Sequence, residues 1–476
     1  MNAVDDRQLS RGALVGLVVG SMVGAGIFTL PAAFARSTGV LGGLISWLIA
    51  GTGMLMLALV FQSLARRKPQ IDTGIYGYAK SGFGNYLGFS AAFGYWIACC
   101  LADVACLILI KATLGQFFPA FGNGSTAVAI VSASALVWAF HLLILRGVKQ
   151  AAALNTIATF AKIIPIVLFV VVLVAGFQRE VFALNFWGGE PATLSSVASQ
   201  VRNTMLVTVF VFVGIEGASV YSRYARNRED VGVATILGFV GVLCLLMLVT
   251  IFSYGILLRP DLAALAYPSM AGVMEAIVGP WGRVFISVGL LVSVLGNYLS
   301  WSLLAAEVLH SAAKSGTVPA FIARENGNGV PVTALWLSNA VIQAFVLVTW
   351  FAESAFTIAL KMTSAMTLIP YLLVAAYACK LAWTGESYPG VGPGRRRDAA
   401  IAWIAAVYAA AMIYAGGARF LLLSALLYLP GTWLYLVARR EQGALLFNRV
   451  ERLVFAAVAV AALAALYGLL SGRLII

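Results

Sequence analysis

Long apolar runs constrain this chain most, because nearly all of it is divided into them. Each is close to or above the roughly 20 residues that a helix needs to cross the hydrocarbon core of a bilayer. Only helices and closed barrels satisfy their backbone polar groups in lipid, and runs this long indicate helices. The sequence therefore predicts an all-α polytopic membrane protein with about 12–13 transmembrane helices. The predicted spans are residues 12–35, 40–64, 86–114, 125–145, 152–176, 200–222, 232–258, 281–312, 333–351, 356–383, 400–417, 419–438 and 453–471.

Composition supports this class and excludes others. Hydrophobic residues make up 62% of the 476 residues and charged residues 10%, against about 45–50% and about 25% in soluble domains. A soluble enzyme and a disordered or fibrous chain are thus excluded. No segment outside the apolar runs is long enough for a second domain. We therefore expect one transmembrane domain, residues 1–476, in which any recognition occurs within the helix bundle.

The net charge of +13 is explained by membrane topology. With the N-terminus in the cytoplasm, about three Lys or Arg residues face inward for each one that faces outward, which fits the positive-inside rule. The basic residues form no single soluble face, so no nucleic-acid partner is expected. The outward set is Arg36, Arg179, Arg202, Arg259, Arg283, Arg419 and Arg473. Thirteen spans would leave the C-terminus outside and twelve would leave it inside, depending on whether Gly416, Gly417 and Arg419 divide one apolar region.

The first span is rich in helix-breaking residues. Gly20, Gly24 and Gly26 precede Pro31, and each interior glycine costs a helix about 1 kcal/mol relative to alanine. An unwound stretch here would expose backbone N–H groups beside the positive end of the following half-helix, which binds a carboxylate without a cationic side chain. Close packing through small residues is the alternative explanation.

The sixth span has a matching interruption, where Glu216 lies between Gly214 and Gly217. An ionisable residue within a span is costly and faces a cavity or a partner. Two broken helices five spans apart indicate an inverted repeat with its binding site near the bilayer midplane.

Several motifs together resemble a known family. They are residues 20–31, Thr73 to Ala79, Tyr95-Trp96, residues 214–219, Trp301 to Glu307 and residues 318–331. With them the chain resembles the amino acid–polyamine–organocation superfamily, and within it the basic amino acid/polyamine antiporters, with the arginine/ornithine antiporters as the nearest branch. The resemblance implies a LeuT-like 5+5 fold. Residues 12–176 and 200–383 would form the two inverted repeats, and residues 400–471 peripheral C-terminal helices.

The resemblance also implies a set of substrate-binding residues. The substrate carboxylate would meet the unwound backbone of the first span, and the α-amino group would meet carbonyls of both broken spans. Aromatic rings would pack the cationic side chain through cation–π contacts. The carboxylate positions are Gly24, Ala25 and Gly26, with Ser21 just before them; the amino positions are Ile27, Phe212 and Ile215; the aromatic positions are Tyr95, Phe210 and Trp301.

Some positions depart from the family pattern. Phe210 stands where the family often has Trp, a stronger cation–π partner. Asp103 replaces a small polar residue, and it either contacts a substrate amino or distal cationic group or neutralises Lys111. Lys361 either faces the cavity, which favours a substrate bearing a carboxylate, or reaches the interface or an acidic partner.

Two charged residues bear on whether transport is coupled to sodium ions or to protonation. Lys162 matches a lysine whose ammonium replaces a sodium ion between spans 1 and 8 in some superfamily members. We therefore predict no sodium requirement; a structural ion pair is the alternative. Glu216 would offset the positive charge of the substrate or link transport to a protonation state.

The predicted function is secondary active transport, with no enzymatic activity and no cofactor or metal ion. The protein would exchange external arginine for internal ornithine across the inner membrane by alternating access. Other amino acid/decarboxylation-product exchange, such as arginine/agmatine or lysine/cadaverine, and proton-coupled uptake are the alternatives. The expected partners are amino acid substrates and the lipid bilayer, and a homodimer is one open option for assembly.

Overall fold

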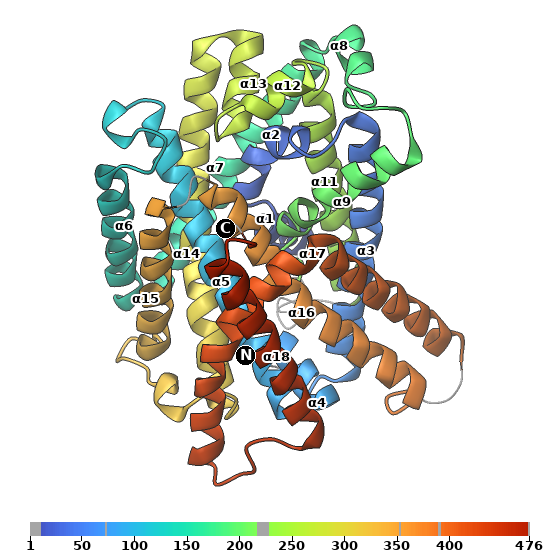
Figure 1. Ribbon diagram of the computed structural model, residues 1–476, viewed down its shortest axis with the longest axis vertical. Helices are drawn as coiled ribbons and strands as arrows, with labels where there is room; N and C mark the ends of the chain where they lie inside the picture. Colours follow the sequence, from blue (N-terminus) through green and yellow to red (C-terminus); the bar gives the residue numbers. More distant parts are fainter. Residues whose placement is uncertain (1–10, 72–73, 217–227, 352–353, 389–391, 475–476) are drawn as a thin grey trace, which may run out of the picture.

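The structure is a computed structural model, and it describes residues 11–71, 74–216, 228–351, 354–388 and 392–474. Within these ranges every regular element is helical (Figure 1). Nine described helices are long and apolar enough to cross a membrane, which confirms the polytopic membrane fold. They are α3 (Val40–Arg67), α5 (Asn85–Gly115), α6 (Ala127–Leu145), α11 (Arg228–Ser253), α14 (Pro280–Lys314), α15 (Val332–Val348) with a short 3₁₀ turn (Thr349–Phe351), α16 (Ala355–Thr384), α17 (Pro393–Glu441) and α18 (Arg449–Leu470).

The predicted first, fifth and sixth spans correspond to helices outside this set of nine. The first consists of α1 (Arg11–Met22), the 3₁₀ segment η2 (Ala25–Thr29) and α2 (Leu30–Ala35). The fifth is α7 (Val148–Ala175), and the sixth begins with α9 (Leu194–Phe210). Residues 211–216 then form turns, and the rest of the predicted sixth span lies outside the described residues. The first helix is therefore broken as predicted, and the sixth ends before Glu216.

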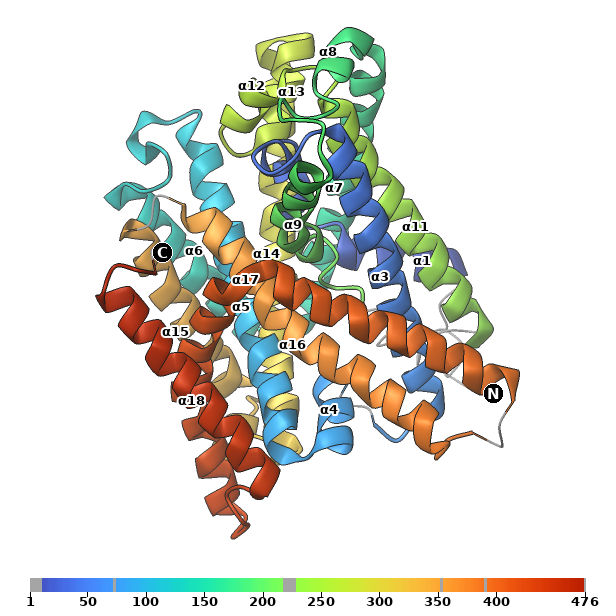
Figure 2. The same cartoon turned by 45° about the vertical axis from the view of Figure 1, so that its right-hand side comes forward.

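Helix α17 contains the most uncertain span boundary of the sequence. Gly417 has φ +78° and ψ +165°, so the helix is broken at this residue. The parts on either side are each about 36 Å long at 1.5 Å per residue, and either can cross a core of about 30 Å. Figure 2 shows α17 turning sharply within its length. The break lies where the sequence places Gly416, Gly417 and Arg419, and each part of α17 is long enough to be a span of its own.

Four short helices lie outside the long spans. On one side are α8 (Arg179–Leu184), α12 (Arg259–Ala264) and α13 (Ser269–Val278), and on the other is α4 (Ile75–Phe83), as Figure 1 shows at its top and bottom. Helix α11 ends five residues before the predicted limit of 258. The side-chain amide of Asn185 donates to the carbonyls of Tyr254 (2.7 Å) and Leu257 (2.9 Å), which holds this segment in a turn.

Helix α5 lies at the centre of the bundle and packs against α14 and α16. Most of its residues are buried, including its polar Asp103. The 3₁₀ segment η2 contacts α14 and α13, and α9 packs against α3 and α16. This arrangement brings the break in the first span and the end of α9 against the middle of α5, α14 and α16.

Candidate functional site

The break in the first span leaves backbone groups without helical partners. Helix α1 ends at Met22, and Gly24 is extended with φ −113° and ψ −163°. The chain resumes at Ala25 as a 3₁₀ helix that runs directly into α2. The first N–H groups of a helix have no intrahelical acceptor, and a helix N-terminus carries partial positive charge. Gly24, Ala25 and Gly26 therefore form a local site suited to a carboxylate.

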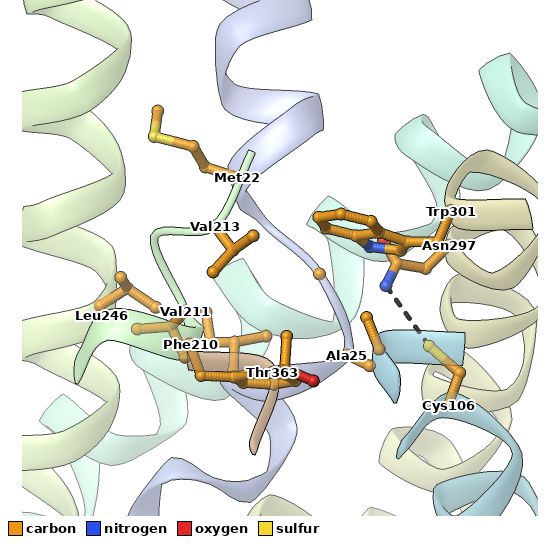
Figure 3. A pocket seen from close by; sticks show the side chains of 14 residues that line it. Met22, Ala25, Cys106, Phe210, Val211, Val213, Leu246, Asn297, Trp301 and Thr363 are labelled. Carbon is orange, nitrogen blue, oxygen red and sulfur yellow. Dashed lines mark hydrogen bonds between the residues drawn. The ribbon is translucent and has the colours of Figure 1, made fainter. Parts of the chain in front are cut away.

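A cavity lies beside this break. Figure 3 shows Trp301 and Asn297 on one side of the cavity and Phe210 and Val211 on the other. The lining residues are Met22, Gly24, Ala25, Gly26, Ile27, Ala102, Cys106, Phe210, Val211, Val213, Leu246, Asn297, Trp301 and Thr363.

Two glycines of the break lie close to side chains of neighbouring segments. A Cβ atom on Gly26 would lie 2.9 Å from the Val211 side chain and 3.0 Å from the Phe210 ring. A Cβ on Gly24 would lie 3.2 Å from the amide nitrogen of Asn297. The glycines thus let the backbone of the first span pack close to α9 and α14. A role as a flexible hinge alone would not require this close packing.

Six of the predicted substrate residues are brought together at the cavity. Gly24, Ala25, Gly26, Ile27, Phe210 and Trp301 all line it. Phe212 and Ile215 are buried beyond its wall, and Phe212 stacks on Phe239 with ring centroids 5.2 Å apart. The side chain of Ser21 lies outside the described part of the chain.

Tyr95 and Glu216 meet one another rather than the cavity. The hydroxyls of Tyr95 and Tyr371 both donate to the Glu216 carboxylate, which also accepts the Gly214 N–H at 3.2 Å. Tyr371 lies eight residues beyond the cavity-lining Thr363 on α16, which is about 12 Å along the helix. These three side chains, here called the Glu216 layer, join α5, α16 and the turns that follow α9. They lie between the cavity and the side of the molecule where α4 lies.

Asp103 is buried in α5, directly after the cavity-lining Ala102. It is 0% exposed, and one carboxylate oxygen accepts a hydrogen bond from the Ser302 hydroxyl at 2.7 Å. The other oxygen has no hydrogen-bond partner among the described residues. Lys111 instead donates to the Thr349 hydroxyl at 3.0 Å. The predicted alternative in which Asp103 neutralises Lys111 is therefore not found in the structure.

Lys162 caps the break from the side of α7. Its ammonium donates to the carbonyl of Gly20 at 2.7 Å, and the side chain is only 4% exposed. Since α1 ends two residues later, this carbonyl is among the last ones without an amide partner in the helix. A cation is favourable at such a helix C-terminus.

Sequence comparison now identifies the family. The family model described as amino acid permease matches residues 9–418. The chain belongs to the amino acid permease family. It is 50% identical to an arginine/ornithine antiporter of Pseudomonas aeruginosa over 480 aligned residues, which cover 100% of both chains. It is 41% identical to an L-lysine transport protein of Corynebacterium glutamicum (99% of this chain, 97% of the relative) and 38% identical to an arginine/agmatine antiporter of Chlamydia abortus (90% and 89%).

The prediction of a transporter of the amino acid–polyamine–organocation type, and not an enzyme, is confirmed by this membership. Within this amino acid permease the sequence reasoning missed several cavity residues. Asn297 is one turn from Trp301 on α14, so an amide at this spacing in an apolar helix is a usable signal. Cys106 accepts a hydrogen bond from Asn297 at 3.5 Å. Cys106 and Thr363 have no comparable signal, because small residues are common in membrane helices.

Proposed function

We propose that this amino acid permease is a secondary active transporter that exchanges external arginine for internal ornithine by alternating access. The observation that supports it most is the cavity beside the broken first span, where backbone N–H groups and two aromatic rings converge. The relatives named as arginine/ornithine and arginine/agmatine antiporters support an exchange of basic substrates.

The proposed pose begins with the substrate backbone. The carboxylate binds the free N–H groups at Gly24, Ala25 and Gly26, and Ser21 flanks them. The α-amino group binds carbonyls near Ile27 and at the end of α9, including the stretch from Phe212 to Ile215. The site has no cationic side chain among its described lining residues. The helix N-terminus therefore supplies the positive potential for the carboxylate.

The cationic side chain of the substrate would lie between Phe210 and Trp301. A guanidinium or ammonium over an aromatic face gains about 0.5–2 kcal/mol, more when water is excluded. Asp103 lies behind this wall, held by Ser302. We propose that its negative charge, one residue beyond the lining, favours a cation in the cavity without direct contact.

The Glu216 layer would be the inner barrier of an alternating-access cycle. Its three side chains come from α5, α16 and the turns that follow α9, and hydrogen bonds join these segments on one side of the cavity. Opening toward that side requires these contacts to break. Phe210 is the proposed cap on the opposite side. The pseudo-symmetric repeats 12–176 and 200–383 would move against each other around the fixed site.

We propose that transport is independent of sodium. The Lys162 ammonium supplies one fixed positive charge at the C-terminal end of α1, where it contacts the Gly20 carbonyl. A sodium ion at this place would compete with that ammonium for the same oxygen.

The proposed location is the bacterial inner membrane with a cytoplasmic N-terminus. The charge bias between loops supports this orientation. The kink at Gly417 supports thirteen crossings and an external C-terminus. Amino acids and the bilayer are the proposed partners, and a homodimer remains an open proposal.

Exchange can be tested in liposomes that contain only the purified protein. Uptake of radiolabelled arginine is measured without sodium into vesicles loaded with ornithine, agmatine, cadaverine or buffer. We expect uptake into ornithine-loaded vesicles and at most a small signal with buffer. Equal uptake into buffer-loaded vesicles would refute exchange. Faster uptake into vesicles loaded with agmatine or cadaverine would mean that this amine, rather than ornithine, is the internal substrate.

A further inference from the structure

Five of the seven arginines predicted on the outer side make contacts of two different kinds. Arg36, Arg259 and Arg283 each donate hydrogen bonds to carbonyl or carboxylate oxygens. Arg202 and Arg419 are exposed, and their recorded contacts are with aromatic rings. Arg202 lies 5.5 Å from the ring centroid of Tyr414, and Arg419 lies 5.5 Å from that of Phe420. The positive-inside rule does not account for these two cations.

A third cation joins them from α16. The Lys361 ammonium lies 5.8 Å from the Phe420 centroid, so Lys361 and Arg419 share one ring. Lys361 is half-buried. Arg202, Lys361 and Arg419 are here called the outer cationic cluster.

The cluster marks a junction of three helices. The Ser364 hydroxyl of α16 donates to the Leu206 carbonyl of α9 at 2.7 Å. A Cβ on Gly416 of α17 would lie 3.2 Å from the Leu206 side chain. Each member of the cluster is three or four residues along the chain from a residue of this junction: Arg202 from Leu206, Lys361 from Ser364 and Arg419 from Gly416. The three cationic side chains therefore come from different helices, each from a position near this junction.

Charge and position indicate what the cluster binds. No carboxylate lies within ion-pair distance of any of its members among the described residues. Lys361 and Arg419, which share the Phe420 ring, repel one another as like charges. The first part of α17 is about 36 Å long, which places its end at Gly417 near the outer interface. Tyr414 is 78% exposed, as is typical of tyrosines at the headgroup level.

We propose that the outer cationic cluster binds the phosphate of an anionic phospholipid in the outer leaflet of the membrane. A second copy of the chain would bring the same positive charges against each other, so charge complementarity favours a lipid. The transported amino acid is also a less suitable ligand for the cluster than a lipid, because Lys361 does not lie on the cavity side of α16. Thr363 lines the cavity, and Lys361, two residues earlier, lies about 160° away around α16.

The test measures lipid binding without transport. The purified full-length protein is titrated in detergent with phosphatidylglycerol, phosphatidylcholine or inorganic phosphate, and its thermal unfolding midpoint is followed by tryptophan fluorescence. R202Q/R419Q removes two charges of the cluster. R179Q/R473Q is the matched control, since both arginines are exposed and on the predicted outer side.

Wild type and R179Q/R473Q are expected to be stabilised by phosphatidylglycerol at the same half-saturating mole fraction. Each basic residue near an anionic lipid surface contributes about a fivefold change in binding, so R202Q/R419Q should need a roughly 30-fold higher fraction. The single variant K361Q should need about fivefold more, which keeps the proposal testable if the double variant does not fold. Equal stabilisation by phosphatidylcholine or by inorganic phosphate, or an equal loss in R179Q/R473Q, would overturn the proposal.

Discussion

Replacing Lys162 with methionine tests how the break in the first span is held open. Methionine retains most of the apolar stem and removes the ammonium that donates to the Gly20 carbonyl at 2.7 Å. That carbonyl has no amide partner in the helix. Because Lys162 is 4% exposed, water cannot readily take its place. The lost contact leaves a buried acceptor unsatisfied at the end of α1.

The size of the effect follows from this contact. A hydrogen bond to a charged group contributes about 1.5–3 kcal/mol. If it stabilises the broken conformation that binds substrate, its loss reduces the population of that conformation by about 10- to 150-fold. We expect arginine uptake into ornithine-loaded vesicles to fall by that factor in Lys162→Met, measured as initial rate per molecule of reconstituted protein.

The matched control is Lys111→Met. Lys111 is also a lysine within a span and is 3% exposed, but it donates to the Thr349 hydroxyl, away from the break. Lys111→Met should retain the arginine KM of the wild type. Wild-type uptake should be equal in sodium and in N-methylglucamine buffers. Full activity of Lys162→Met, or a wild-type requirement for sodium, would refute the reasoning.

Three other substitutions have defined outcomes. Gly26→Ala should abolish arginine binding measured by tryptophan quenching, because its Cβ would lie 2.9 Å from Val211; wild-type affinity would contradict the packing argument. Tyr371→Phe removes one hydroxyl from Glu216 and should change the maximal exchange rate by about tenfold with little change in KM; a change in KM alone would place Tyr371 in the binding site. Asp103→Asn should raise the KM for arginine about tenfold and leave that for a neutral amino acid unchanged; equal effects on both would mean a purely structural role.

The sequence predicted the backbone part of the site well and the side-chain part less well. The break between Met22 and Ala25 follows from local chemistry, since closely spaced glycines weaken a helix wherever it lies. The end of α9 before Glu216 has the same origin. Gly417, a glycine with φ +78°, likewise breaks the long helix α17 where a pair of glycines and an arginine interrupt an apolar run.

Side-chain partners depend on how distant helices are oriented, which a single sequence does not encode locally. Tyr95 and Trp301 both read as aromatic wall residues, but only Trp301 lines the cavity. The hydroxyl of Tyr95 instead donates to Glu216, which also accepts from Tyr371 of α16. The short helices α8, α12 and α13 were not predicted, because their sequences are too short for a clear periodic pattern.

The measurement that tests obligatory exchange most directly is ornithine efflux. Vesicles containing the purified protein are loaded with radiolabelled ornithine, diluted into sodium-free buffer, and followed with and without external arginine. Exchange predicts that ornithine stays inside until arginine is added and then leaves one for one with the arginine that enters. Ornithine efflux at the same rate without external arginine would contradict the exchange mechanism.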